Sequence, residues 1–111
     1  MKYRYNYIVQ YQEVDDTRRL RLHTMENYLL NVAGKVADEM GIGINSLLPY
    51  NCTWIITHLN LEMLYLPTHC EEMVIETWIE QNAHMLSVRD FRIYIKGIDG
   101  ERLIGTAKSV W

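Results

Sequence analysis

The chain has 111 residues, with 11 Lys and Arg against 14 Asp and Glu, and this length suits one domain, 1–111, around one core. The formal net charge of −3 leaves no basic excess, which argues against nucleic acid as a partner, and no run approaches the roughly 20 apolar residues of a membrane span. The N-terminus lacks the apolar segment of a signal peptide, and Cys52 and Cys70 make no disulfide framework, so we expect a cytoplasmic protein with reduced thiols.

One long amphipathic helix is the clearest element of the sequence. A strand predicted over residues 3–14 precedes it, and the Asp-Asp-Thr of residues 15–17 breaks that strand. The helix is predicted over Met25–Met40, with Thr24 as its N-cap and Gly41 as the residue that stops it. Its apolar positions follow the i, i+3, i+4, i+7 spacing of a single buried stripe: Met25, Tyr28, Leu29, Val32, Ala33, Val36, Ala37 and Met40.

Strands dominate the rest of the chain. Residues 44–48 are predicted to form a short helical turn that Pro49 closes. The Gly-Ile-Asp-Gly of residues 97–100 is a hairpin turn, because Asp-Gly suits positive φ values. The four predicted strands are residues 53–66, which Pro67 stops, 72–81, 86–96 and 101–111.

The order of elements is therefore β-α-β-β-β-β. A single helix with this many apolar strand faces available favours an α+β domain in which a curled antiparallel sheet wraps the helix, the hotdog fold. Ala33, Gly34 and Ala37 are then expected to let the helix lie close against the sheet. The alternative is an open sheet with the helix on one face.

Several short segments, in order, carry a resemblance to a known family. They are YQEVDDTRRLRL at 11–22, MENYLL at 25–30, TWII at 53–56, ETW at 76–78, RDF at 89–91 and TAKSVW at 106–111. Together they resemble the first half of the acyl-acyl-carrier-protein thioesterases. The resemblance covers nearly the whole chain and implies a hotdog domain that acts in the hydrolysis of fatty acyl-carrier-protein thioesters in fatty acid biosynthesis.

The resemblance carries one important departure. Members of that family have two hotdog halves, and their catalytic Asn, His and acidic or Cys residues belong to the second half, which matches nothing here. The chain is expected to be either a first-half domain that shapes the acyl-chain pocket or a free-standing relative. A free-standing copy is expected to pair with itself as a homodimer. A third alternative is an acyl-binding domain without turnover.

Asp16 and His23 are the candidate catalytic residues. Thioester hydrolysis needs a carboxylate that activates water or attacks the carbonyl, and backbone N–H groups at a helix N-terminus that bind the oxyanion. The seven-residue spacing of this pair is similar to that of small single-hotdog thioesterases of the hydroxybenzoyl-CoA type. Arg18 and Arg19 replace the glycines of that motif, and Gln12 stands where such enzymes often have Tyr. The alternative is a turn aspartate and a solvated histidine.

An acyl chain would need an apolar slot, most simply between the helix and the sheet. The candidate lining residues are Asn27, Tyr28, Val32, Val36, Trp54, Ile56 and Trp78, with Asn27 and Asn31 as possible donors to a thioester carbonyl. In any hotdog the apolar ones would also serve as ordinary core. Arg18, Arg19 and Arg21 are candidates for docking an acidic acyl carrier protein or the phosphate of its pantetheine arm, or else belong to a solvated loop.

Arg89 shares the apolar face of its strand with Phe91 and therefore needs a partner, which we expect to be Glu62 or Glu76. No cofactor is implied. His58, His69, His84 and Cys70 lack the spacing of zinc ligands, so no metal site is predicted. The absence of a G-x-S-x-G motif argues against a Ser-His-Asp hydrolase.

Overall fold

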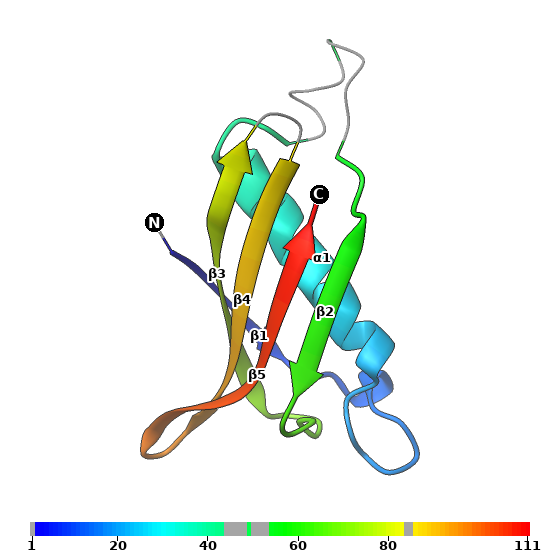
Figure 1. Ribbon diagram of the computed structural model, residues 1–111. Helices are drawn as coiled ribbons and strands as arrows, with labels where there is room; N and C mark the ends of the chain where they lie inside the picture. Colours follow the sequence, from blue (N-terminus) through cyan, green and yellow to red (C-terminus); the bar gives the residue numbers. More distant parts are fainter. Residues whose placement is uncertain (1, 44–48, 50–53, 84–85) are drawn as a thin grey trace.

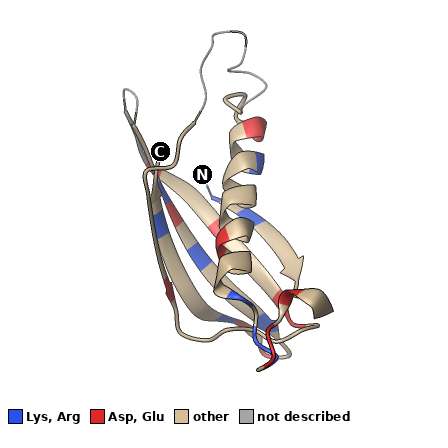
Figure 2. Ribbon diagram, turned by 90° about the vertical axis from the view of Figure 1, so that its right-hand side faces the viewer, with Lys and Arg blue, Asp and Glu red and all other residues tan. Residues whose placement is uncertain are grey.

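The computed structural model describes residues 2–43, 49, 54–83 and 86–111, and it has the hotdog architecture (Figure 1). A five-stranded antiparallel sheet forms one layer and a single long helix lies across one of its faces (Figure 2). The strand order is β1-β3-β4-β5-β2. The elements are β1 Tyr3–Ile8, a 3-10 turn Tyr11–Glu13, α1 Leu22–Glu39, β2 His58–Met63, β3 Glu72–Ala83, β4 Leu86–Gly97 and β5 Gly100–Val110.

The core lies between α1 and the inner face of the sheet. Alternation along β3 and β4 directs one set of side chains toward the helix, as the period of a strand requires. Met73 and Ile75 on β3 are cross-strand partners of Ile95 and Ile93 on β4, and all four are buried. From the helix, the predicted stripe supplies the buried residues Met25, Leu29, Val32, Ala33, Val36 and Ala37.

The helix begins earlier than the sequence predicted. Thr24 is not the N-cap, because α1 starts at Leu22 and Arg21 occupies the cap position with an extended backbone. The chain is held there by backbone bonds, since Leu20 N–H donates to the oxygen of Pro67 and Arg21 N–H donates to the oxygen of Glu13. These bonds fix the entry into the helix without a capping side chain.

At its other end the helix stops as predicted. Met40 is the C-cap, and Gly41 follows with a φ of 75°, a left-handed conformation that glycine adopts without steric cost. The short helical turn predicted over 44–48 lies outside the described residues. No helix among the described residues is long and apolar enough to cross a membrane.

Two predicted strands are shorter in the structure. The first ends at Ile8, because Val9 bonds to the segment before β3 and Glu13 Oε1 then accepts the N–H of Gln10, which turns the chain. The second, predicted over residues 53–66, is confined to β2.

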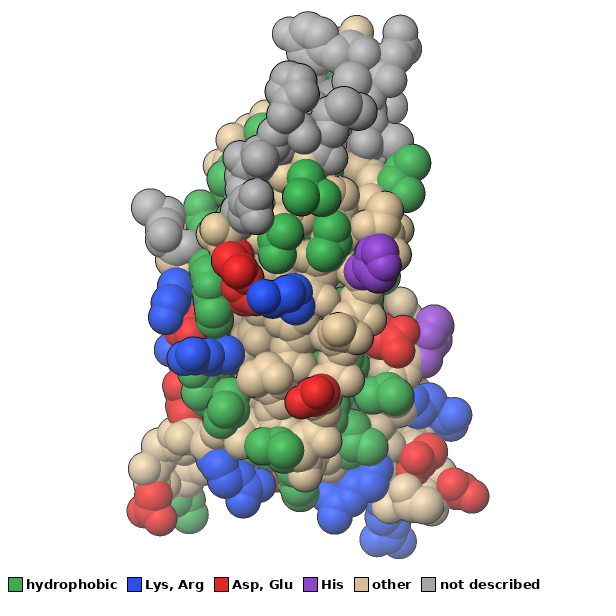
Figure 3. All heavy atoms as spheres, viewed as in Figure 1, with side chains coloured by type: hydrophobic (Ala, Val, Ile, Leu, Met, Phe, Trp, Pro, Cys, Tyr) green, Lys and Arg blue, Asp and Glu red, His purple; other side chains and the backbone are tan. Residues whose placement is uncertain are grey.

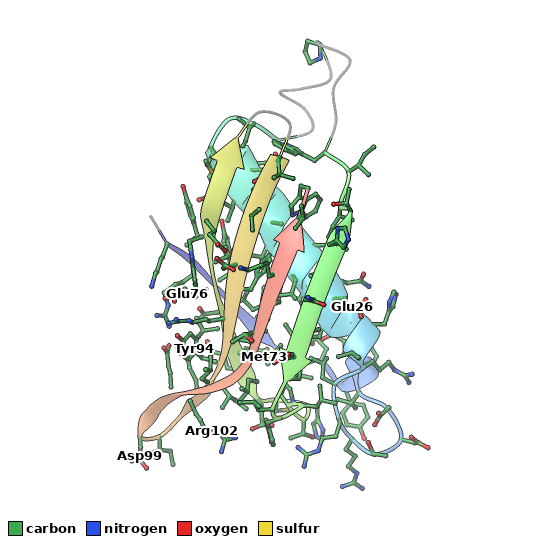
Figure 4. The ribbon with its side chains drawn as sticks, in the orientation of Figure 1. Glu26, Met73, Glu76, Tyr94, Asp99 and Arg102 are labelled. Atoms are coloured by element: carbon green, nitrogen blue, oxygen red, sulfur yellow. The ribbon has the colours of Figure 1, made fainter. Side chains whose placement is uncertain are left out.

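The β4–β5 hairpin agrees with the prediction. Gly97 pairs with Gly100, whose φ is 113°, and Ile98 and Asp99 form the turn between them. Figure 4 labels Asp99 and Arg102 at this end of the sheet, and Figure 1 marks the C-terminus at the opposite end of β5. The cavity described next lies at the other end of the same two strands.

Candidate functional site

A cavity of about 420 Å³ lies between the C-terminal half of α1 and the ends of β4 and β5. The helix contributes residues at positions i, i+3, i+4, i+7 and i+8, which share one face. The walls are mostly apolar. The lining residues are Leu30, Ala33, Gly34, Ala37, Asp38, Gly43, Trp54, Ser87, Arg89 and Trp111.

Small side chains on the helix create this space. Ala33 and Ala37 are buried at the cavity wall, whereas Gly34 is exposed. A Cβ atom added at Gly34 would meet no atom within 4 Å, so this glycine does not serve close packing. The expectation that Gly34 lets the helix approach the sheet is therefore wrong, and the residue leaves the wall of the cavity open.

Two tryptophans form walls that hydrogen bonds hold in place. Trp54 Nε1 donates to the backbone oxygen of Ile42 at 2.8 Å, and Trp111 Nε1 donates to Ser109 Oγ at 2.8 Å. The backbone of Trp111 also exchanges two bonds with Ser87, of 2.9 and 3.1 Å, which extends the β4–β5 ladder to the cavity. The indole rings are thus anchored at their polar edges, as buried Trp usually is.

Arg89 is the buried charged group of the cavity, whereas Asp38, which also lines it, is exposed. Arg89 lies on the inner face of β4 with 4% of its surface exposed. Its Nη1 donates to the backbone oxygen of Ala33 at 2.7 Å, and its Nε is buried without a hydrogen-bond partner among the described residues. Burial lowers the pKa of this guanidinium, which nevertheless remains protonated at neutral pH.

The predicted carboxylate partners of Arg89 are wrong. Glu76 lies on the outer face of the sheet, where its carboxylate is 3.4 Å from Arg4 Nη1. Glu62 also lies on the outer face, beside a shallow hollow of that surface. Because alternate residues of a strand point to opposite faces, neither carboxylate reaches the inner face where Arg89 lies.

The predicted lining residues are distributed over different parts of the molecule. Trp54 lies in the cavity wall. Val32 and Val36 are fully buried in the core on the neighbouring helix face, and Ile56 is half-buried outside the lining set. The prediction for Trp78 is wrong, because its ring lies on the outer face of the sheet beneath the guanidinium of Arg92.

Two of the polar residues predicted on the helix, Tyr28 and Asn31, contact the β1 side of the molecule. Tyr28 stacks on Tyr7 with ring centroids 4.7 Å apart, and its hydroxyl donates to Glu13. Burial, followed by this hydrogen bond, raises the pKa of Tyr28. Asn31 Nδ2 donates to Tyr7 Oη at 3.1 Å, and Asn27 is exposed.

Asp16 and His23 flank the start of α1 and are both exposed. The neighbouring Asp15 organises the loop, because its Oδ1 accepts the N–H and hydroxyl of Thr17 and the N–H of Arg19. The bonds from Thr17 hold the pKa of Asp15 below its ordinary value. No hydrogen bond joins Asp16 to His23 in the described part of the chain, and their role stays a prediction.

The three arginines of this loop differ in their contacts. Arg18 is exposed and has a φ of 64°, while Arg21 is exposed at the helix cap. Arg19 Nη1 donates to the backbone oxygen of Leu66 at 3.1 Å, with its guanidinium 5.0 Å from the centre of the Tyr65 ring. The three charges are therefore presented on one surface loop before the helix.

The outer face of the sheet carries charges of both signs, as Figure 3 shows. Lys108 Nζ lies 2.9 Å from Glu80 Oε2 and 3.6 Å from Asp90 Oδ1. Burial and the neighbouring Glu80 raise the pKa of Asp90. Across residues 2–43, 49, 54–83 and 86–111, no three His, Cys, Asp or Glu side chains converge as metal ligands would.

Sequence reasoning missed most of the cavity walls. The sequence feature that indicates the cavity is the Ala-Gly pair at 33–34 with Ala37, because these small residues leave space beside one face of the helix. The same pattern also predicts close packing, which is not found at Gly34. Ser87 and Trp111 had no signal, because their place depends on where two strands end relative to the helix.

Comparisons with known proteins agree with this fold. A family model described as the acyl-ACP thioesterase N-terminal domain matches residues 1–111. The chloroplastic oleoyl-acyl carrier protein thioesterase of Coriandrum sativum is 24% identical over 117 residues, which cover 100% of this chain and 31% of that protein. The solved acyl-ACP thioesterase of Bacteroides thetaiotaomicron is 34% identical with a TM-score of 0.91, over 99% of this chain and 44% of that one.

The fold is also that of smaller thioesterases. The 4-hydroxybenzoyl CoA thioesterase of Pseudomonas sp. strain CBS-3 has a TM-score of 0.88 at 12% identity, over 98% of this chain and 81% of that one. In contrast, the chain spans about a third of the curated relative and less than half of the Bacteroides structure.

Proposed function

Since the chain belongs to the acyl-ACP thioesterase family, whose N-terminal domain it matches along its whole length, we propose that it forms the acyl-chain pocket for the hydrolysis of fatty acyl-carrier-protein thioesters in fatty acid biosynthesis. The cavity between α1 and the ends of β4 and β5 is the observation that carries this proposal. Its volume of about 420 Å³ is in the range of small-molecule sites, and its walls are chiefly apolar.

The loop before α1 supports the carrier-protein half of the proposal. Arg18, Arg19 and Arg21 present three positive charges in one short exposed segment. Acyl carrier proteins are acidic, and opposite charges steer such encounters in a salt-dependent way. Replacing all three with Gln should weaken binding of the acyl-carrier protein and flatten its salt dependence, whereas Lys35→Gln, on the helix surface, should change neither.

A self-sufficient enzyme acting on acyl-CoA is the second candidate function. The first turn of α1 has free backbone N–H groups at the oxyanion position of such a mechanism, and the exposed Asp16 and His23 flank it. In this proposal Asp16 acts as base or nucleophile. Two chains would form one enzyme, which fits a sheet whose edge strand β2 pairs only with β5 among the described residues.

Two measurements test these proposals together. The first is binding of a non-hydrolysable dodecanoyl amide, which is monitored through the fluorescence of Trp54 and Trp111 in the cavity wall. The second is release of thiol from dodecanoyl-carrier protein and dodecanoyl-CoA by the chain and by Asp16→Asn. Binding without turnover supports a pocket-forming domain, and turnover that Asp16→Asn abolishes supports the self-sufficient enzyme. Absence of binding refutes the acyl pocket.

Self-pairing has its own readout. In size-exclusion chromatography a homodimer should elute at about 26 kDa, twice the mass of one chain, and a monomer should elute at 13.2 kDa. Elution at the monomer mass at all concentrations would contradict self-pairing. It would not contradict the acyl pocket, because the cavity is present in a single chain.

A further inference from the structure

The buried cation at the floor of the cavity forms no ion pair among the described residues, although the carboxylate of Asp38 lines the same cavity. None of the ion pairs among the described residues involves Arg89, and the remaining positions of the sequence contain no Asp or Glu. A guanidinium offers five N–H donors in a fixed plane, and here one nitrogen has a backbone partner and another has none. Burying a charge in this way is unfavourable unless something pairs with it.

The cavity has a direction. Gly34 and Asp38 are exposed and mark its mouth on the helix side, whereas Arg89 and Ser87 are buried on the sheet side and form its floor. Between them the walls are the apolar surfaces of Leu30, Ala33 and Ala37 with the two tryptophans. An acyl chain that enters at the mouth would therefore cross apolar surface first and meet the guanidinium with its far end.

We propose that this pocket selects acyl chains that carry a hydrogen-bond-accepting oxygen at or near the end remote from the thioester. Arg89 is the specificity-determining residue, and a hydroxyl, oxo or carboxylate oxygen of the substrate supplies the partner that the described residues do not. This inference rests on the proposed function, because it names the kind of acyl group that the pocket accepts. Plain apolar chains also enter, but they leave the guanidinium unpaired.

Three amide probes that cannot be hydrolysed as thioesters separate the possibilities. They are a decanoyl amide, an ω-hydroxydecanoyl amide and an ω-carboxynonanoyl amide, and their Kd values are measured by the fluorescence of Trp54 and Trp111. A hydrogen bond to a charged group corresponds to about tenfold or more in affinity, so an oxygen-bearing probe should bind at least that much more tightly than the plain one. The comparison of hydroxyl with carboxylate tells whether a neutral or an anionic oxygen is the natural partner.

Arg89→Met removes the cation and keeps an apolar side chain of similar length. This variant should lose the preference for oxygen-bearing probes and bind the plain decanoyl amide at least as well as the original chain. Arg92→Met is the matched control, because Arg92 lies on the same strand but on the outer face against Trp78. It should keep the original preference.

Thermal unfolding distinguishes a ligand-binding role for Arg89 from a purely structural one, because the two roles predict opposite shifts of the midpoint in Arg89→Met. If the guanidinium awaits a ligand, Arg89→Met should raise the midpoint of thermal unfolding of the free chain, and the oxygen-bearing probes should raise that of the original chain more than the plain probe does. A clamp between β4 and the Ala33 oxygen would instead make Arg89→Met less stable.

Each failure has a distinct meaning. Equal Kd values for the three probes on the original chain overturn the inference and leave the acyl pocket in place, and this holds even if Arg89→Met does not fold. A preference that persists in Arg89→Met also overturns it. If no probe binds the original chain, the proposed function fails first and the inference fails with it.

Discussion

Filling the cavity at Gly34, which marks its mouth, should weaken the binding of acyl chains of every length. Gly34 lies in the middle of α1, it lines the cavity, and a Cβ atom there has no neighbour within 4 Å. Gly34→Ala therefore adds a methyl group without a clash. Alanine is favoured over glycine inside a helix by about 1 kcal/mol, so this variant should unfold about 4 °C higher than the original chain.

Gly34→Leu extends the same change into the cavity. The leucine side chain should displace the part of an acyl chain that passes this wall. Each methylene that loses its buried position costs about 0.8 kcal/mol, or about fourfold in Kd. We expect a dodecanoyl amide and an octanoyl amide both to bind roughly fifteenfold more weakly, corresponding to about two methylenes lost, because chains of either length pass Gly34 at the mouth of the cavity.

The assay is a titration of each chain with amides of increasing length, followed by tryptophan fluorescence, beside thermal unfolding by circular dichroism. Gly34→Ala controls for the change in helix stability. Two results would refute the reasoning. Unchanged Kd values in Gly34→Leu would mean that the cavity is not the acyl site, and a lower unfolding midpoint in Gly34→Ala would mean that this position is packed after all.

Three further predictions concern other parts of the fold. Gly105→Ala should lower the free energy of unfolding by about 1–3 kcal/mol in urea titrations, the opposite sign to Gly34→Ala. The Cβ added at Gly105 would lie 3.0 Å from the backbone oxygen of Glu62, which cannot shift as the nearby side chain of Met63 can; an unchanged value would contradict the packing described. Burial and a hydrogen bond to Glu39 raise the pKa of Tyr5 to about 12, whereas the pKa of a tyrosine in an unfolded chain is about 10. The free energy of unfolding should therefore fall as the pH rises through that window, and it should fall less in Tyr5→Phe. Equal pH dependence of the two chains would contradict this explanation. Trp78→Leu should leave the Kd of the dodecanoyl amide unchanged, since Trp78 lies on the outer face of the sheet, and a large increase would place the acyl chain there instead.

The sequence predicted the architecture better than the ends of its elements. The apolar stripe identified α1, because a period of 3.6 residues is set by the helix itself. The helix start was missed, since the bonds that position Leu20 and Arg21 come from Pro67 and Glu13, which only the folded chain brings near. Strand β2 was overextended for a related reason, because its length is set by its pairing with β5.

The candidate site shows a different limit of sequence reasoning. That Arg89 is a charge on an apolar face was readable from the alternation along its strand. Its partner was not, since the choice between Glu76 and the Ala33 oxygen depends on the faces of two strands and on the path of the helix. The cavity itself was unreadable, because a cavity is set by how elements cross and not by any local pattern.

The strand order also has a consequence for how the chain acquires its structure. Among the described residues, β1 pairs only with β3 and β2 pairs only with β5, so neither of the first two strands has a partner earlier in the chain. During synthesis, α1 can form as a local helix, but the edge strand β2 has nothing to bond until Gly100–Val110 has left the ribosome. Such long-range pairings are slow to form. We therefore expect the eleven-residue strand β5 to complete the sheet. Strand β2 should join the sheet late, because it can pair only after β5 has left the ribosome.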